Sequence, residues 1–249
     1  MSIFWTLLRR ELSSFFFSLT GYVIIAAVTL ITGSSFVMLI HNMGTGSFSM
    51  PVTELFFSSQ MYWLLVILIA PVITMRLFAQ EKAAGTFETL MTTPVGDLQV
   101  VTAKFAAAAV FYMVAWLPTL ASLLIVQHFT NQPRADWGMI GGLLLGIFLS
   151  GCMFLSIGCL ASSLTKSQMV AAMISLAAGV VLYILAYMAV VTPATTNAGA
   201  SALFYFNLFK QMEDFTRGVM DTRAVIFYAT ATFCFLFLTL RVVESRRWK

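Results

Sequence analysis

Long runs of apolar residues alternate with short polar segments along the whole chain. A helix needs about 20 predominantly apolar residues to cross about 30 Å of hydrocarbon. The pattern therefore predicts an all-α, polytopic membrane protein, with a single transmembrane domain over residues 1–249. The six expected spans cover about residues 20–40, 60–78, 105–127, 138–162, 168–192 and 224–240.

An amphipathic helix is predicted before the first span. Over residues 3–16, one helical face carries Phe4, Leu8, Leu12 and Phe15, and the other carries Thr6, Arg9, Arg10 and Ser13. This division is typical of an interfacial helix that lies on the cytoplasmic leaflet. The alternative is that the segment is only the start of the first span.

A second amphipathic helix is predicted before the last span, because residues 193–222 are too polar to cross the membrane. Its apolar stripe is Phe204, Leu208, Met212, Phe215 and Val219, and its polar stripe is Asn207, Lys210, Gln211, Asp214 and Arg217. We expect it at the outer leaflet, with Gly218 near its C-terminal end and Asp221 or Thr222 capping the last span.

The composition supports a membrane protein and no appended soluble domain. Hydrophobic residues make up 60% of the 249 residues and charged residues only 10%, and the mean hydropathy is +0.91. A soluble domain carries about 25% charged residues. The three cysteines lie inside apolar runs without metal-type spacing, so we interpret them as small buried side chains.

Basic residues predict the orientation, because they gather in cytoplasmic loops. With both termini inside, ten of the 14 Lys and Arg residues are cytoplasmic: Arg9, Arg10, Arg76, Lys82, Lys104, Lys166, Arg241, Arg246, Arg247 and Lys249. Only Arg134, Lys210, Arg217 and Arg223 are outside. The net charge of +4 is explained by topology and anionic lipid, and no nucleic-acid partner is needed.

Apart from Arg76 near the cytoplasmic end of the second, the expected spans contain no Asp, Glu, Lys, Arg or His, which argues against an ion-coupled transporter or a proton pump. No metalloprotease or hydrolase motif occurs, and Lys166-Ser167 lacks the glycines of a phosphate-binding loop. The sequence therefore predicts no catalytic residue, metal site or cofactor in this chain. A membrane enzyme would have to use His41, His128, Glu54 and Asp136, which are scattered over different loops.

Small residues recur at helical spacing in two spans. Gly142, Gly146 and Ser150 are followed by Gly151 and Gly158, and residues 171–179 repeat the pattern. Small residues let helices approach closely, so we favour ordinary helix packing over a substrate-specific role.

The loop between the second and third spans carries the most informative motif. Ala83, Ala84, Phe87, Leu90 and Met91 form an apolar stripe of helical period, opposite a polar face of mixed charge. We expect one helix over residues 79–94, ended by Pro94, with Gly85 at mid-helix marking a close approach. It forms either a docking surface or a simple membrane anchor.

Residues 75–90, MRLFAQEKAAGTFETL, together with Pro94, resemble the signature of ABC-2 type permeases, approximately E-E-K-x-x-G-T-x-E-x-L-L-x-x-P. Gln80 departs from the acidic residue at the first position. FTRGVMD at 215–221 and ESRRWK at 244–249 are similar to the gliding-motility-associated and NosY-like branch of that family. The resemblance implies a multi-pass protein of the bacterial inner membrane.

The resemblance also implies that the 79–94 helix is received by a cytoplasmic ABC ATPase, present in two copies, which binds ATP and magnesium. A second permease would complete a homodimer or heterodimer. The implied coupling residues are Gln80, Glu81, Lys82, Gly85, Thr86, Glu88, Thr89 and Pro94. The implied outer gate involves Asn207, Phe215, Arg217 and Gly218. Pro71 is either a kink point or a tolerated proline.

Two functions remain open for such a subunit. The uncharged spans favour an exporter of a hydrophobic or amphipathic substrate. The alternative is a mechanotransmitter, in which ATP energy drives a periplasmic accessory protein without transport. The predicted outer loops are short, so that role would require a separate periplasmic partner.

Overall fold

The computed structural model describes residues 3–45, 52–57, 59–87, 96–129, 137–191 and 206–247, and within them it has helices and no strand. Six helical segments of this part are long and apolar enough to cross a membrane. They correspond to α2 (Leu19–Thr45), α4 (Gln60–Thr74, with the segment continuing to Ala84), α7 (Asp97–Phe129), α8 (Trp137–Leu164), α9 (Gln168–Val191) and α12 (Thr222–Arg247). The predicted all-α, polytopic fold is confirmed.

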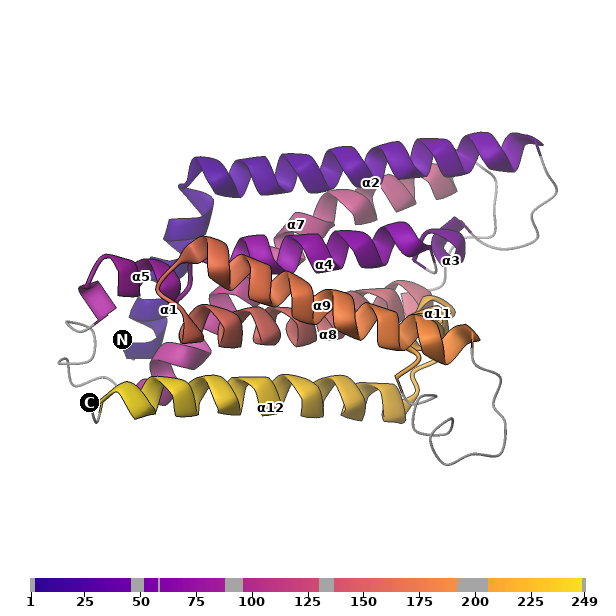
Figure 1. Cartoon of the computed structure of the whole chain (residues 1–249). Helices are drawn as coiled ribbons and strands as arrows, with labels where there is room; N and C mark the ends of the chain where they lie inside the picture. The colour runs from indigo at the N-terminus through magenta and orange to yellow at the C-terminus, as the bar shows by residue number, and fades with distance from the viewer. Residues whose placement is uncertain are drawn as a thin grey trace, which may run out of the picture.

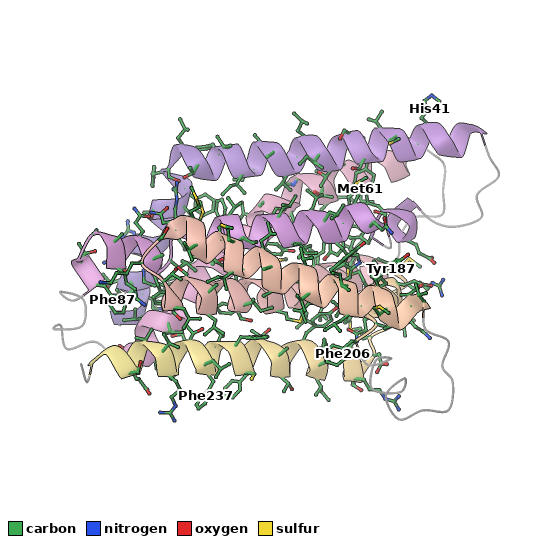
Figure 2. All side chains as sticks on the ribbon, viewed as in Figure 1. His41, Met61, Phe87, Tyr187, Phe206 and Phe237 are labelled. Carbon is green, nitrogen blue, oxygen red and sulfur yellow. The ribbon has the colours of Figure 1, made fainter. Side chains whose placement is uncertain are left out.

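The long helices lie side by side along a common direction (Figure 1). Both chain termini lie at the same end of the bundle, as an even number of spans requires. We call this end the terminal end and the opposite end the distal end. In Figure 2, Phe87 lies at the terminal end, and His41 and Phe206 lie at the distal end.

Helices α8 and α4 form the centre of the bundle. Within their most apolar windows, 72% of the residues of the α8 segment and 67% of those of the α4 segment are buried. The corresponding share is 22% for α2 and α9 and 11% for α12. The exposed side chains of these outer helices are largely apolar, as a surface in contact with lipid requires.

The small residues of α8 bring neighbouring helices close. A Cβ atom at Gly158 would lie 2.0 Å from Thr74 Oγ1 of α4, and one at Gly151 would lie 2.1 Å from Tyr112 of α7. Ser150 is hydrogen-bonded to the Tyr62 hydroxyl of α4, at 2.9 Å. The interpretation of these positions as packing residues is confirmed.

The third span differs from its expected range. Helix α7 begins at Asp97, so Lys104 lies inside it, with its side chain only 3% exposed. Helix α7 thus begins eight residues before the expected third span, and Lys104 lies in this added part, paired with Glu11 and Glu81. Helix α7 also continues through Pro118 and α4 through Pro71.

The N-terminal amphipathic helix is confirmed as α1 (Ile3–Phe16). It packs against α7, where the ring of Phe15 stacks on that of Phe111 at a centroid distance of 5.0 Å. Phe16 meets the same ring edge-on. The apolar face of α1, opposite Arg9, is therefore packed against the protein.

The helix predicted before the last span is α11 (Leu208–Thr216), with Leu208, Met212 and Phe215 buried as expected. The apolar stripe does not extend to Val219, which is 57% exposed. Val219 cannot continue the stripe, because the chain turns at Gly218, whose φ of +77° ends the helix. Phe204 lies outside the described residues. Asp221 caps α12 as predicted, since its carboxylate accepts the Arg223 N–H at 2.9 Å.

The single helix expected over residues 79–94 is wrong in its described part. Helix α5 spans only Ala79–Ala83, and Gly85, expected at mid-helix, has a φ of +72°. A left-handed residue cannot continue a right-handed helix, and glycine adopts this conformation at the lowest cost. Residues 79–87, the described part of the segment, therefore form a short helix and a sharp turn at Gly85, after which Thr86 and Phe87 are helical again.

Candidate functional site

Four charged residues from three helices meet at the terminal end. Glu81 Oε1 of α5 lies 2.8 Å from Arg10 Nη2 of α1 and 2.9 Å from Lys104 Nζ of α7. Glu11 Oε1 of α1 lies 2.8 Å from the same Arg10 atom and 3.0 Å from Lys104 Nζ. This group, called the ionic cluster below, joins α1, α5 and α7, with two positive charges matched by two negative ones.

Three of the four side chains of the ionic cluster are shielded from water, and only Arg10 is exposed, at 53%. The side chains of Lys104, Glu11 and Glu81 are 3%, 11% and 18% exposed. Burial raises the pKa of Glu11, but the charges and hydrogen bonds of Lys104 and Arg10 outweigh it and hold that pKa below its ordinary value. The hydrogen bond from Arg10 to Glu11 in turn raises the pKa of Arg10. Glu11 and Arg10 therefore favour their charged forms.

Helix α8 binds the backbone N–H groups at the start of α5. Ser162 Oγ accepts the N–H groups of Phe78 and Ala79, each at 3.1 Å, and donates to the Met75 carbonyl at 3.2 Å. The Lys82 ammonium group donates to the carbonyl oxygen of Ser163. These bonds satisfy the free N–H groups at the beginning of α5 and attach it to the last turn of α8.

The predicted coupling residues separate into two groups. Glu81 and Lys82 point into the protein, where Glu81 is part of the ionic cluster and Lys82 binds α8. Gln80, Gly85 and Thr86 are exposed. Successive helical residues differ by about 100° in direction, so Gln80 faces outward beside an inward Glu81. The remaining predicted residues, Glu88, Thr89 and Pro94, lie outside the described residues.

Sequence reasoning missed Glu11, Lys104 and Ser162 as partners of this site. Glu11 interrupts the apolar stretch of α1, and Lys104 directly precedes the third expected span, so both were conspicuous. Their pairing joins residues 93 positions apart, and no local pattern reports a contact of that separation.

At the distal end, the predicted gate residues lie within α11 and at its two ends. Asn207 caps its first turn by accepting the Lys210 N–H at 3.0 Å. Phe215 is 1% exposed and packs on α8, where a Cβ atom at Gly146 would lie 3.0 Å from the Phe215 Cβ. Gly218 turns the chain beside the Met139 backbone. Asn207, Phe215 and Gly218 thus fix the position of α11.

Arg217 joins α11 to the short helix α3 (Val52–Phe57). Its guanidinium group donates twice to Glu54 Oε1, at 2.6 and 3.2 Å, and lies 2.6 Å from Glu213. The hydrogen bond to Glu54 raises the pKa of Arg217. Glu54, which the sequence placed among scattered polar residues, is therefore the tertiary partner of a predicted gate residue.

Helix α8 contacts both sites. Its last turn carries Ser162 and Ser163 against α5, and its first turns carry Gly142 and Gly146 against α11. Its 28 residues extend about 42 Å at 1.5 Å per residue. One central helix therefore connects α5 at the terminal end with α11 at the distal end.

The described ranges assemble no candidate metal site, and they separate the polar residues that a membrane enzyme would have to use. In this part of the chain, no three His, Cys, Asp or Glu residues are placed to hold a metal ion. His41 is exposed at the distal end (Figure 2), and Glu54 is bound to Arg217. The side chain of His128 and all of Asp136 lie outside the described residues.

Comparison with known proteins gives one family. The model described as "ABC-2 family transporter protein" matches residues 7–243, a range that includes every residue of the ionic cluster and of the contacts around α11. No curated protein matches the chain.

Proposed function

Because the chain belongs to the ABC-2 family of transporter proteins, it is a permease subunit of an ABC transporter, and we propose that it exports a hydrophobic or amphipathic substrate. The energy comes from a separate cytoplasmic ATPase that docks on residues 79–94. ATP and magnesium are bound by that ATPase. The terminal end of the bundle is then its cytoplasmic end, in the bacterial inner membrane.

The docking surface consists of the outward residues of the 79–94 segment. Gln80, Gly85 and Thr86 are exposed, and the segment continues from there toward Glu88, Thr89 and Pro94. An ATPase subunit contacts these residues, while Glu81 and Lys82 hold the base of the segment in the membrane domain.

The observation that carries the proposal is the double ion pair of Glu81. One carboxylate oxygen binds Arg10 of α1 and Lys104 of α7, and the neighbouring Lys82 binds α8. A push by the ATPase on this segment is therefore transferred to three helices at once. Packed helices respond by moving as rigid bodies.

Helix α8 is the route to the outer gate. Its close contacts with Phe215 and Gly218 mean that a displacement of α8 reaches α11 directly. The bond between Arg217 and Glu54 holds α11 against α3 in the present conformation. Opening at the distal end breaks this bond, and closing re-forms it.

An apolar groove supports a hydrophobic or amphipathic cargo. Residues of α7, among them Phe105, Met113 and Leu117, line a cavity of about 410 Å³ together with Phe148 of α8. No ionisable residue lines it. Such a surface suits acyl chains or other apolar groups and offers nothing to a hydrophilic solute.

Membership of the family implies an ABC ATPase partner and dimerisation in general. We propose a dimer of two permease chains with two ATPase copies. The similarity of residues 215–221 and 244–249 to the gliding-motility-associated and NosY-like branch adds a periplasmic accessory protein as a further candidate partner.

The experiment separates docking from transmission. The tagged full chain is purified from its native membranes, the co-purifying ATPase is identified by mass spectrometry, and the complex is reconstituted in nanodiscs. We expect Gln80→Lys and Thr86→Lys to weaken ATPase binding about tenfold, as charges introduced into an interface do. Glu81→Gln should retain binding but lose most of the substrate-stimulated ATP hydrolysis.

Ser245→Lys is the matched control, because Ser245 is exposed on α12 at the same end. It should leave both binding and hydrolysis unchanged. If no ATPase co-purifies, or if Gln80→Lys and Thr86→Lys bind it as wild type does, the docking proposal fails. If Glu81→Gln is fully active, transmission through the ionic cluster fails.

A further inference from the structure

A cavity of about 340 Å³ lies at the terminal end, between α1, the beginning of α2, the end of α4, α5 and α7. Its polar wall includes the ionic cluster, Arg76 and the hydroxyl groups of Ser14, Ser18 and Thr20. Its apolar wall includes Val23, Ile24 and Val72. The volume is at the lower end of the range of about 300–1,000 Å³ for small-molecule sites.

The charges in this cavity do not balance. Glu11 and Glu81 are both matched by Arg10 and Lys104. In the described part of the chain, Arg76 pairs with no carboxylate, and its hydrogen-bond partner is the Thr20 hydroxyl, at 2.6 Å. A guanidinium group has five N–H donors, and a partly buried charge favours a counter-charge. The cavity thus has one surplus positive charge with unused donors.

The apolar wall opens toward lipid. Val23 of α2 and Val72 of α4 line the cavity, and 56% and 40% of their surfaces are exposed. Both lie within one or two turns of the terminal ends of their helices, which places the opening near the headgroup level of the surrounding leaflet. A water-soluble anion would explain the surplus charge but not this apolar opening.

We propose that the cavity binds the phosphate group of an anionic phospholipid from the leaflet that surrounds the terminal end. Arg76 binds the phosphate, with the hydroxyls of Ser18 and Thr20 beside it. The acyl chains leave along Val23 and Val72. Basic pockets between membrane helices are suited to such headgroups, and guanidinium binds phosphate through two parallel hydrogen bonds. The inference does not depend on an ATPase partner.

The test is native mass spectrometry of the detergent-solubilised full chain, titrated with phosphatidylglycerol, phosphatidylcholine or inorganic phosphate. Wild type should bind one phosphatidylglycerol about tenfold more tightly than phosphatidylcholine. Arg76→Gln should weaken that first binding event about tenfold, because a charge-assisted hydrogen bond is lost. Arg76→Lys, which keeps the charge but loses the two-pronged geometry, should fall between them.

Arg9→Gln is the control, because Arg9 is exposed on α1 and does not line the cavity. It should change the affinity less than about twofold, the limit expected for a screened surface charge. Equal losses in Arg9→Gln and Arg76→Gln would overturn the proposal in favour of non-specific attraction. Equal binding of phosphatidylcholine would also overturn it, as would displacement of the lipid by inorganic phosphate, which would indicate a soluble anion. Wild-type affinity in both Arg76 variants would exclude Arg76 as the ligand.

Discussion

Lys104 Nζ of α7 lies 3.0 Å from Glu11 Oε1 of α1, although 93 residues separate them in the chain. This bond orients the N-terminal helix on the bundle, together with the contacts of Phe15 and Phe16 on Phe111. Since Lys104 also binds Glu81, the position of α1 and that of α5 depend on the same ammonium group.

The first prediction concerns the pH dependence of stability. The folded-state pKa of Glu11 lies below its ordinary value of 4.5, so its ionised form stabilises the folded protein. This contribution is present above about pH 4.5 and is lost as the pH falls through the lower folded-state pKa. Glu11→Gln should therefore lower the Tm at neutral pH, and the gap from wild type should close in acid.

Thermal unfolding in detergent between pH 7 and pH 3 measures this gap. Glu244→Gln on α12 is the control, because its partner Arg241 is 63% exposed and such pairs contribute little. A gap between Glu11→Gln and wild type that stays constant over the whole pH range would contradict the prediction.

The second prediction concerns the contact between α8 and α4. Gly158→Ala should destabilise the protein by about 1–3 kcal/mol, the usual cost of overpacking, because the new methyl group would lie 2.0 Å from Thr74 Oγ1. Gly141→Ala in the same helix has no atom within 4 Å of its Cβ and should stabilise by up to about 1 kcal/mol through helix propensity. Thermal unfolding of both variants, compared with wild type, decides the outcome. A similar effect of the two substitutions would show that close packing at Gly158 is unimportant.

The third prediction concerns the bond between α11 and α3. Glu54→Gln removes the tertiary partner of Arg217, whereas Glu213→Gln removes only a partner on the same helix. Amide hydrogen exchange in α11 should therefore become a few-fold faster in Glu54→Gln and change less in Glu213→Gln, because only the first variant frees the helix locally. Faster exchange in Glu213→Gln than in Glu54→Gln would contradict the assignment of Glu54 as the anchor.

The fourth prediction concerns the turn after α5. Gly85→Ala should cost about 1–2 kcal/mol, since a Cβ is unfavourable at a φ of +72°, and Gly85→Asn should cost less. A steric clash does not contribute to this cost, because no atom lies within 4 Å of the Gly85 Cβ position. Gly96→Ala, at an exposed glycine outside the left-handed region, is the control. Thermal unfolding checks all three variants, and a neutral Gly85→Ala would exclude the turn.

Much of the fold follows from the sequence, because each membrane span can be recognised from its own residues. An apolar run of sufficient length must form its hydrogen bonds internally in lipid, so the six spans are visible without knowledge of their neighbours. The amphipathic helix at 3–16 and the cap at Asp221 are equally local and were predicted correctly. The helix over 79–94 was not, because its apolar spacing is helical, while the backbone conformation of Gly85 is set by its surroundings.

The sequence by itself determined the spans, the short amphipathic helices and the motif at residues 75–94. Tertiary structure alone decided which residues of that motif face the protein. Glu81 and Lys82 appear in the sequence as members of a polar ridge, and packing turns them toward Lys104 and Ser163. The reason is physical: hydrophobic period and length depend on neighbours within a few residues, whereas an ion pair or a cavity depends on helices that the chain brings together from distant positions.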